Sequence, residues 1–249
     1  MKIIPLSEGS FTIDKTKLFV PFDHGEHDLQ ARPVGSLLVE VQPFVIITSE
    51  DVLLIDAGLG FETDGVMQIH RNLMEAGINP GEVTKVLMSH LHKDHAGGVS
   101  RRNHSSGQQE LAFPQATYYI QKKELEFAFE KGIPSYIPEE LECLKNCDNV
   151  VLLDGDGVIN SYIQYQLVGG HCPYHQVFRI VDGGETAFFG GDDAPSLLQM
   201  KTKFVAKYDY DGKRAMELRQ QWWQQGSEED WQFLFYHDTK TPVVKAGRQ

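Results

Sequence analysis

The sequence has little cysteine, and its three cysteines cannot support a disulfide framework. Cys143, Cys147 and Cys172 are too few and odd in number for the paired pattern of a small secreted domain. The four-residue spacing of Cys143 and Cys147 on a predicted helix is better explained by packing, because no second Cys or His pair follows at a zinc-finger spacing. The cysteines therefore indicate neither a disulfide scaffold nor a zinc finger.

Basic residues are also scarce. Lys and Arg total 23 against 35 Asp and Glu, which gives a formal net charge of -12. Affinity for nucleic acid depends largely on basic residues that meet phosphates, and adjacent pairs such as Arg101-Arg102 do not extend into a patch. We therefore expect no nucleic-acid partner.

The chain contains no long apolar run. No stretch approaches the roughly 20 apolar residues that a membrane-spanning helix needs. The first residues lack the apolar run of a signal peptide, since Pro5, Ser7 and Glu8 interrupt it. We expect a cytoplasmic protein without a membrane partner. No linker or repeat divides the 249 residues, so a single domain is predicted over residues 1–249.

Apolar strand patterns alternate with helical ones along the chain. Residues of predicted strands are rich in β-branched and aromatic side chains, and Gly77 and Gly132 are placed to end two helices. Two blocks of strands flanked by helices predict a layered α/β sandwich. The strands are predicted at 36–48, 51–58, 85–89, 116–121, 150–154, 162–168, 176–181, 186–190 and 231–237, and the helices at 65–77, 123–132, 138–146 and 213–226.

The last predicted helix carries two adjacent tryptophans, Trp222 and Trp223. We expect them in the core or at an interface rather than as a platform for a ligand. A homodimer interface would suit them, because aromatic residues are enriched at such interfaces.

Four ligand-capable side chains follow one short apolar strand. The segment SHLHKDHAGG at 89–98 places His90, His92, Asp94 and His95 within six positions. Imidazole and carboxylate are suitable ligands for Zn, Mn, Fe or Co. The glycines that follow allow the backbone to turn sharply beside a charged site. The segment therefore predicts a metal site rather than a polar surface loop.

Three further polar residues stand at the ends of other apolar strands. His171 follows YIQYQLVGG, Asp192 follows TAFFGG and His237 ends WQFLFYH. Taken singly, each would be an ordinary turn residue. Taken together, they supply three more ligands from separate strands, as a site built at the edge of a sheet requires.

These motifs together resemble the metallo-β-lactamase superfamily. The H-x-H-x-D-H segment, the later Gly-His, the Gly-Asp and the late His come in the family's order, and LLIDAG at 53–58 resembles its first motif. The resemblance covers nearly the whole chain and implies a four-layer αββα sandwich. Chain length and His237 make the acyl-homoserine lactonase branch the nearest in resemblance.

The resemblance implies two divalent metal ions, with zinc preferred and manganese, iron or cobalt as alternatives. It also assigns the residues around them. His90, His92 and His171 would hold the first ion; Asp94, His95 and His237 would hold the second; Asp192 would bridge the two; and Asp56 would orient the ligand loops by hydrogen bonds. Asp193 is the alternative register for the bridging residue.

The same resemblance implies a hydrolase. A hydroxide held between the two metals would attack a small ester-like substrate, and Asp94 would also help to move a proton to the leaving group. A lactone is the first substrate class to consider. Thioesters and phosphotriesters remain alternatives, as does a one-iron oxidoreductase similar to the sulfur dioxygenases.

The sequence departs from the family pattern at two places. In Gly-His-Cys-Pro-Tyr-His, Tyr174 stands in place of a glycine, which leaves the role of His175 open. Cys172 is predicted to be a packed thiol, because neighbours on a strand point opposite ways. The lactonase branch has a catalytic tyrosine where this chain has Pro195, and Tyr208 or Tyr210 could replace it.

Aromatic side chains near the predicted site could form an apolar wall for a small organic substrate. We expect Phe19, Phe22, Phe204 and Tyr208 to contribute to this wall. His24 and His27 follow no strand end, so we expect them in a solvated or substrate-facing loop rather than on a metal.

Overall fold

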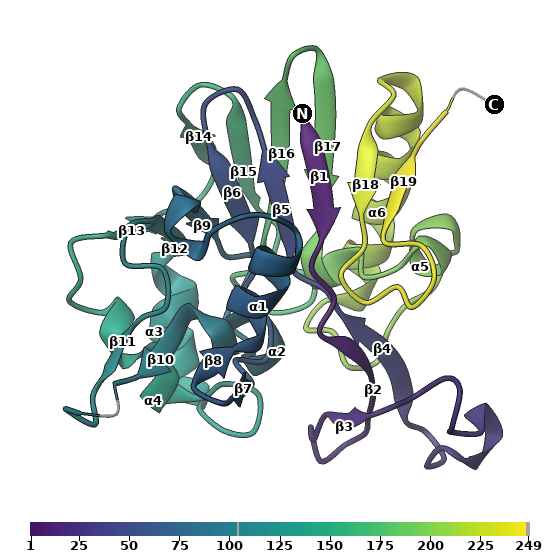
Figure 1. Cartoon of the computed structure of the whole chain (residues 1–249). Helices are drawn as coiled ribbons and strands as arrows, with labels where there is room; N and C mark the ends of the chain where they lie inside the picture. The colour runs from purple at the N-terminus through teal and green to yellow at the C-terminus, as the bar shows by residue number, and fades with distance from the viewer. Residues whose placement is uncertain (104, 248–249) are drawn as a thin grey trace.

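Two six-stranded sheets dominate the computed structural model, which describes residues 1–103 and 105–247 (Figure 1). The first sheet has the order β1 (Lys2–Pro5), β5 (Phe44–Ile47), β6 (Val52–Ile55), β9 (Lys85–Leu87), β12 (Thr117–Gln121), β13 (Val150–Leu153). The second has the order β14 (Gly157–Ile159), β15 (Ile163–Leu167), β16 (Gln176–Asp182), β17 (Glu185–Phe189), β18 (Gln232–Leu234), β19 (Val243–Lys245).

Smaller pairings complete the strands. A three-stranded sheet of order β3 (Val20–Pro21), β2 (Gly9–Ile13), β4 (Leu37–Val41) forms an arm at the lower right of Figure 1. Two short ribbons pair β7 (Glu62–Thr63) with β8 (Val66–Met67) and β10 (Ser100–Arg102) with β11 (Gln109–Leu111).

Alternation along the strands divides the core into layers. In β5 and β6, Ile46 and Leu53 belong to a buried cluster that also contains Phe178 and Phe189 of the second sheet. The neighbouring residues Val45 and Leu54 face the opposite side of the sheet, where they pack under helices. Because successive side chains of a strand point to opposite faces, one apolar run can serve both layers.

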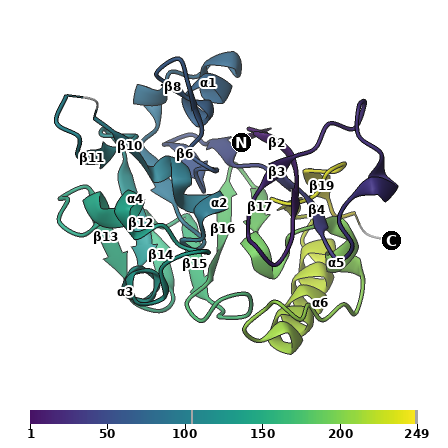
Figure 2. The same cartoon turned by 90° about the horizontal axis from the view of Figure 1, so that it is seen from below.

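Helices cover the two outer faces, as Figure 2 shows from below. On the first sheet lie α1 (Gln68–Glu75), α3 (Lys122–Lys131) and α4 (Pro138–Leu141), and on the second lie α5 (Leu197–Lys201) and α6 (Gly212–Glu228). Trp222 of α6 is buried against Phe188 of the second sheet, and the half-buried Trp223 packs on Phe233. The predicted four-layer αββα sandwich is confirmed.

The predicted strand at 36–48 is wrong in one respect, because the chain breaks it at Gln42 and Pro43. β4 pairs with β2 in the arm, whereas β5 pairs with β1 and β6 in the first sheet. Pro43 has no N–H to donate to a ladder, and its carbonyl accepts from the N–H of Leu6 at 2.8 Å. A proline within an apolar run therefore marks the change of sheet.

Several other elements differ from the sequence prediction. The helix expected at 138–146 ends at Leu141 and continues as a 3₁₀ turn over Glu142–Leu144. The missed elements include β1, β2, β3, β14, β19 and α5, and none of these has more than five residues. Short edge strands carry too little periodicity to be recognised in a sequence.

The strand ends that carry the predicted ligands meet at one edge of the sandwich. β6 runs parallel to β9, and β17 runs parallel to β18. The short helix α2 (Lys93–Ala96) lies below this edge in Figure 1, at the end away from both termini. Within the described residues, no helix has the length and apolar character to span a bilayer.

The glycines after the H-x-H-x-D-H segment allow close packing rather than a left-handed turn. The φ of Gly97 is -59°. A Cβ on Gly98 would lie 2.0 Å from the carbonyl oxygen of Ala57, and one on Gly97 would lie 2.3 Å from that of Leu59. The loop after β9 therefore presses directly on the loop after β6.

We predict that Gly98→Ala lowers the free energy of unfolding by about 1–3 kcal/mol, because the added methyl group meets backbone that cannot rotate away. Guanidinium denaturation of the metal-free protein, followed by tryptophan fluorescence, measures this change. The matched control is Gly247→Ala, where a Cβ meets nothing within 4 Å. Equal stability of the two variants would contradict the prediction.

Candidate metal centre

The structure brings the predicted ligands together in two groups of three. In the first group, Nδ1 of His92 lies 3.0 Å from Nε2 of His90 and 3.1 Å from Nε2 of His171. In the second group, Oδ2 of Asp94 lies 3.6 Å from Nε2 of His95 and 3.5 Å from Nε2 of His237. Within each group, the three potential ligand atoms lie within 4.8 Å of one another, close enough to share one metal ion.

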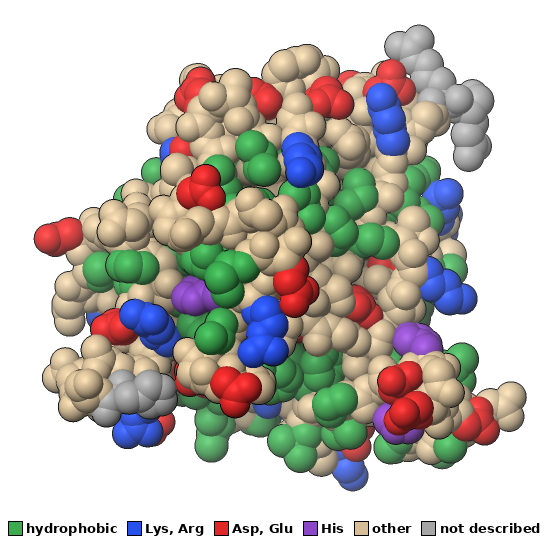
Figure 3. Space-filling model, in the orientation of Figure 1, with side chains coloured by type: hydrophobic (Ala, Val, Ile, Leu, Met, Phe, Trp, Pro, Cys, Tyr) green, Lys and Arg blue, Asp and Glu red, His purple; other side chains and the backbone are tan. Residues whose placement is uncertain are grey.

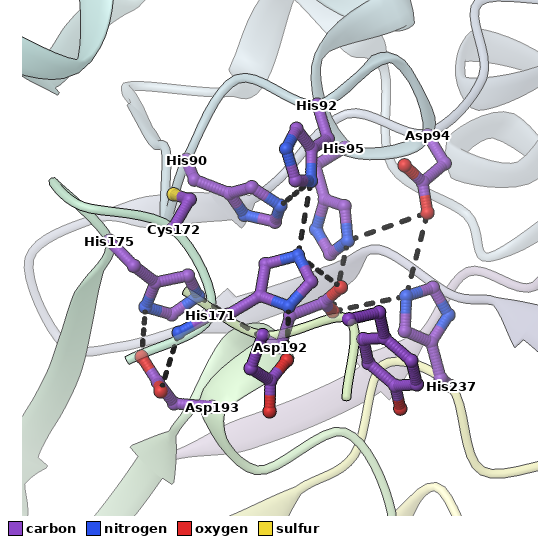
Figure 4. A network of polar contacts seen from close by, with 12 residues as sticks. His90, His92, Asp94, His95, His171, Cys172, His175, Asp192, Asp193 and His237 are labelled. Atoms are coloured by element: carbon purple, nitrogen blue, oxygen red, sulfur yellow. Dashed lines mark hydrogen bonds and ion pairs between the residues drawn. The ribbon is translucent and has the colours of Figure 1, made fainter. Parts of the chain in front are cut away.

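Asp192 lies between the two groups (Figure 4). Its Oδ1 is 3.1 Å from Nε2 of His95 and 3.0 Å from Nε2 of His237, both in the second group. Its Oδ2 is 3.3 Å from Nε2 of His171 in the first group. Asp193 instead faces His175, with Oδ2 3.0 Å from Nδ1. The geometry therefore favours Asp192 over Asp193 as the residue that both groups share.

The local backbone explains how one short segment serves both groups. β9 ends at Leu87, and the extended chain beyond it carries His90. His92 has extended backbone angles at the N-cap of α2, so the helix begins directly after it. The first turn of α2 then directs Asp94 and His95 toward the second group. The turn is helical, which the sequence analysis did not predict.

Asp56 fixes the orientation of two of the imidazoles. Its Oδ2 accepts from Nδ1 of His95 at 2.7 Å and from Oγ of Ser89 at 2.7 Å. Since the Ser89 hydroxyl proton goes to Asp56, its oxygen accepts from Nδ1 of His90 at 3.0 Å. Both imidazoles therefore carry their proton on Nδ1 and direct the Nε2 lone pair into the cluster.

Two other acceptors fix the orientation of the imidazoles that come from the second sheet, those of His171 and His237. Nδ1 of His171 donates to Oδ1 of Asp209 at 2.9 Å, and Nδ1 of His237 donates to the carbonyl oxygen of Glu40 at 2.6 Å. Their Nε2 atoms are left with free lone pairs that face the first and second group. An acceptor behind each ring is the usual support of a metal-binding histidine.

The pKa values of the buried side chains reflect the mixture of imidazoles and carboxylates in the two groups. Burial, together with the neighbouring histidines, lowers the pKa of His90 and of His92 well below the usual value. Burial would also lower the pKa of His95, but the carboxylates around it, Asp192 first, raise it well above the usual value. Burial opposes ionisation of Asp192, yet the imidazoles of His237, His95 and His171 lower its pKa well below the usual value. The buried carboxylates therefore require positive charge beside them.

Among the buried side-chain atoms that have no hydrogen-bond partner within the part of the chain that the structure describes, two belong to these groups. They are Nε2 of His95 and Oδ1 of Asp192. A buried polar atom without a partner is costly unless a metal or another group binds it. Imidazole nitrogen and carboxylate oxygen are ligands that zinc and similar divalent ions accept. The residues present therefore fit two divalent ions.

His175 supports the shared aspartate instead of joining either group. Its Nε2 accepts from the backbone N–H of Asp192 at 3.1 Å, which places its proton on Nδ1, toward Asp193. Asp193 in turn accepts from the backbone N–H of His171 at 2.9 Å. The pair of His175 and Asp193 thus connects the loops that carry His171 and Asp192.

Cys172 is buried and contacts Glu124, with Sγ 3.5 Å from Oε2. Burial raises the pKa of this thiol well above its usual value, so it stays protonated. Glu124 also accepts from the N–H of Leu91 at 3.0 Å and from the hydroxyl of Tyr136, whose ring packs on His92. The thiol belongs to a buried network beneath the first group.

Sequence reasoning missed several supporting residues, of which Asp209 is the clearest. Its side chain is 1% exposed and contacts His171. Tyr236, also missed, donates to the carbonyl of Asp94 at 2.6 Å and stacks on His95 with ring centroids 4.0 Å apart. Asp209 directly follows Tyr208, and Tyr236 directly precedes His237. Nothing else in a single sequence distinguishes the two from ordinary core residues.

A cavity of about 850 Å³ opens above the two groups. Its floor includes His92, Asp94, His171, Asp192 and His237, and its apolar wall includes Ile13, Phe19, Leu37, Leu38, Val39, Pro195, Leu197 and Leu198.

Of the four predicted wall residues, Phe19 and Tyr208 line this cavity. Phe22 is buried instead against the rings of His24 and His27, and Phe204 is 45% exposed outside the lining. The expectation for Phe22 and Phe204 is therefore corrected.

The histidines of the N-terminal loop lie away from the two groups. Nε2 of His24 contacts Oγ of Ser10 at 3.1 Å, and Nδ1 of His27 accepts from the N–H of Asp23 at 3.0 Å. Local hydrogen bonds account for both side chains, in agreement with the expectation that they form a loop.

Comparison with known proteins agrees with this geometry. Residues 38–221 match the model of the metallo-beta-lactamase superfamily. The chain belongs to this superfamily, since the match covers well over half of its length.

Three individual proteins are similar to the chain. An N-acyl homoserine lactonase, AttM of Azorhizobium caulinodans, is 30% identical over 115 residues, which are 42% of this chain and only 38% of the lactonase. A probable metal-dependent hydrolase from Staphylococcus aureus superposes with a TM-score of 0.78 at 23% identity, over 100% of this chain and 93% of that one. The dizinc quorum-quenching lactonase AidC gives 0.71 at 21% identity, over 98% and 89% of the two chains.

We predict that Asp209→Ala weakens metal binding by the first group about 10- to 100-fold, because His171 loses the acceptor that orients it. Competition with a chelating dye measures zinc affinity in two steps, and only the step that belongs to His90, His92 and His171 should weaken.

Asp209→Asn keeps an acceptor oxygen, so its effect should be smaller, and exposed Asp148→Ala serves as the control. Unchanged affinity in Asp209→Ala would show that the contact with His171 does not matter.

Glu8 is a buried carboxylate beside the centre. Its Oε2 accepts from the N–H of Leu59 at 2.7 Å, whereas its Oε1 has no hydrogen-bond partner among the described residues. Burial, with a smaller contribution from the charge of Asp94, raises the pKa of Glu8 to about 7 from 4.5. The folded state therefore holds this proton more tightly than the unfolded state.

This pKa has a consequence for stability. Between the unfolded pKa and the folded one, rising pH removes the proton more readily from the unfolded chain, so the contribution of Glu8 to stability falls as pH rises and levels off above about 7. We predict that Glu8→Gln gains stability relative to the wild type, by on the order of 3 kcal/mol, between pH 5 and pH 8.

Urea denaturation of the two metal-free proteins at several pH values gives this difference. Glu26→Gln, on an exposed side chain, is the control. A difference between Glu8→Gln and the wild type that is independent of pH would contradict the raised pKa.

Proposed function

We propose that this chain is a two-metal hydrolase of small ester-like substrates, and that a lactone is the first substrate class to test. One observation carries the proposal: the two oxygens of Asp192 reach histidines of both groups, at 3.3 Å on one side and 3.0–3.1 Å on the other. A shared carboxylate is what a site for two neighbouring ions needs.

The assignment of ligands follows the two groups. His90, His92 and His171 would hold one ion, Asp94, His95 and His237 the other, and Asp192 both. When bound, the two ions supply a hydroxide nucleophile at neutral pH and polarise the substrate carbonyl. Zinc fits this ligand set, and manganese, iron or cobalt accept it as well.

The chain's own residues position the substrate and move the proton. Asp94 lines the cavity, so its carboxylate can receive a proton and pass it to the leaving oxygen of the ester. Tyr208 lines the cavity next to His171, with ring centroids 6.3 Å apart, and its hydroxyl accepts from Nε2 of Gln199 at 3.3 Å. The phenolic proton is therefore free to be donated to a substrate oxygen.

The similarity to lactonases supports a lactone, and the cavity suits a small acyl group against its apolar wall. Thioesters and phosphotriesters need the same nucleophile and remain the second choice. The complete second group of Asp94, His95 and His237 counts against the one-iron oxidoreductase, which would leave these residues without a role.

We predict two zinc or manganese ions per chain by elemental analysis of the protein purified without added metal. In a panel of lactones, thioesters, aryl esters and phosphotriesters, the lactones should have the highest kcat/KM. Asp192→Ala should lower kcat/KM for the lactones at least about 100-fold. Loss of a residue that only supports a metal ligand costs up to about that factor, and Asp192 is proposed as a ligand itself.

The control is Asp148→Ala, which lies outside the cavity. Activity of the wild type no greater than that of Asp192→Ala across the panel would overturn the hydrolase proposal. A single iron per chain would favour the oxidoreductase.

A further inference from the structure

The cavity above the two groups is rich in lysine, although the chain carries a net charge of -12. Five lysines line it, and they come from four separate segments of the chain. They are Lys15, Lys17, Lys93, Lys201 and Lys240. Apart from the metal-centre residues Asp94 and Asp192, the lining contains only two acidic residues, Asp14 and Asp238.

These two aspartates bind backbone and hydroxyl groups nearby. Asp14 accepts from the N–H and the hydroxyl of Thr16 at 2.8 and 2.6 Å. Asp238 accepts from the N–H groups of Leu197, Lys240 and Thr241 at 2.8–2.9 Å. Their carboxylates thus hold the loops at the rim of the cavity in place.

None of the five cavity lysines forms an ion pair within the described part of the chain. The lysines that do so, Lys85, Lys131, Lys145 and Lys213, all lie outside the lining. On the face drawn in Figure 3, basic side chains are scattered among acidic ones without a continuous patch. Lysines without an ion pair also occur elsewhere among the described residues, for example Lys122 and Lys123, but in the cavity five of them surround one opening.

Two of the lysines are close to the metal centre. Lys93 lies between His92 and Asp94 in the chain, and its ammonium is 5.9 Å from the ring centroid of Phe19, which also lines the cavity. Lys17 is half-buried in the lining of the same cavity, whose floor includes His92. A substrate bound at the centre would lie within reach of both.

We propose that the natural substrate carries an anionic group, a carboxylate or a phosphate, separated from the scissile ester by a short apolar segment. The proposal rests on the hydrolase function above and specifies its substrate class. The ester would lie at the metal centre, the apolar segment against the wall of Leu37, Leu38 and Val39, and the anion among the lysines. A neutral lactone would leave the lysines without a partner.

Unpaired charges in a concave site also attract an oppositely charged substrate before contact. Field lines concentrate in such a cleft, and the effect weakens as salt shortens the range of the attraction. The preference for an anionic substrate should therefore depend on ionic strength.

A matched pair of esters tests the proposal. Para-nitrophenyl valerate and mono-para-nitrophenyl glutarate have the same leaving group and acyl chains of equal carbon number, but only the glutarate is charged. We expect kcat/KM for the glutarate to exceed that for the valerate about 10-fold at low salt, and the ratio to fall toward unity between about 0.05 M and about 0.5 M sodium chloride.

Lysine variants locate the effect. In the double variant Lys17→Gln/Lys240→Gln, the ratio of the two kcat/KM values should fall at least about threefold at low salt. The matched control Lys123→Gln/Lys213→Gln removes the same charge from outside the cavity and should keep the ratio. Para-nitrophenyl esters that end in a phosphate distinguish a phosphate from a carboxylate.

A binding measurement separates failure of the proposal from failure of the hydrolase function. Calorimetric titration of the metal-loaded protein with the two product acids should show glutarate binding more tightly than valerate, and the difference should shrink in the lysine variant. Equal binding of the acids, or equal ratios in both double variants, would overturn the proposal. Hydrolysis of neither ester beyond the level of Asp192→Ala, with glutarate still bound more tightly, would overturn the function alone.

Discussion

An acceptor behind the imidazole ring determines the chemistry of the candidate centre. Four of the five histidines donate Nδ1–H to a fixed oxygen, from Asp56, Ser89, Asp209 or the backbone of Glu40. Each bond decides which nitrogen keeps its lone pair and where that lone pair points. Without these bonds, the rings could rotate or change tautomer, and the convergence on two points would be lost. The interlayer packing of the sheets supports the centre mainly by holding these acceptors in place.

Contacts among the ligand side chains join the two halves of the sandwich. Asp56 follows β6 of the first sheet and holds Ser89 and His95, whereas His171 and Asp192 come from loops of the second sheet. The two halves meet across the cluster, where Asp192 lies 3.1 Å from His95. The absence of side chains at Gly97 and Gly98 allows the loops after β6 and β9 to approach within backbone contact. The loops after β6 and β9 therefore both pack closely on each other and hold the ligand side chains in place.

Much of this arrangement could be predicted from the sequence, for a physical reason. Apolar strands followed at once by histidine or aspartate identify both the layers and the edge where the ligands meet, and all seven predicted ligand residues lie there. The sequence predictions failed for side chains that belong to no periodic element and to no motif. Asp209 supports His171 across 38 residues of sequence, and the exclusion of Phe22 and Phe204 from the cavity depends on how the arm and the 203–211 segment fold back. Tertiary placement of loops leaves no local signal in one sequence.

Pro195 supports the second group through its backbone. Its carbonyl accepts from the N–H of His237 at 3.0 Å. The phenol that lines the cavity is Tyr208, next to the residue that orients His171. A shift of this segment would therefore move a substrate contact and a ligand of the first group together. In the proposed function, residues 208 and 209 would thus couple the binding of substrate to the binding of metal, and the lysines of the cavity would select the substrate by its charge.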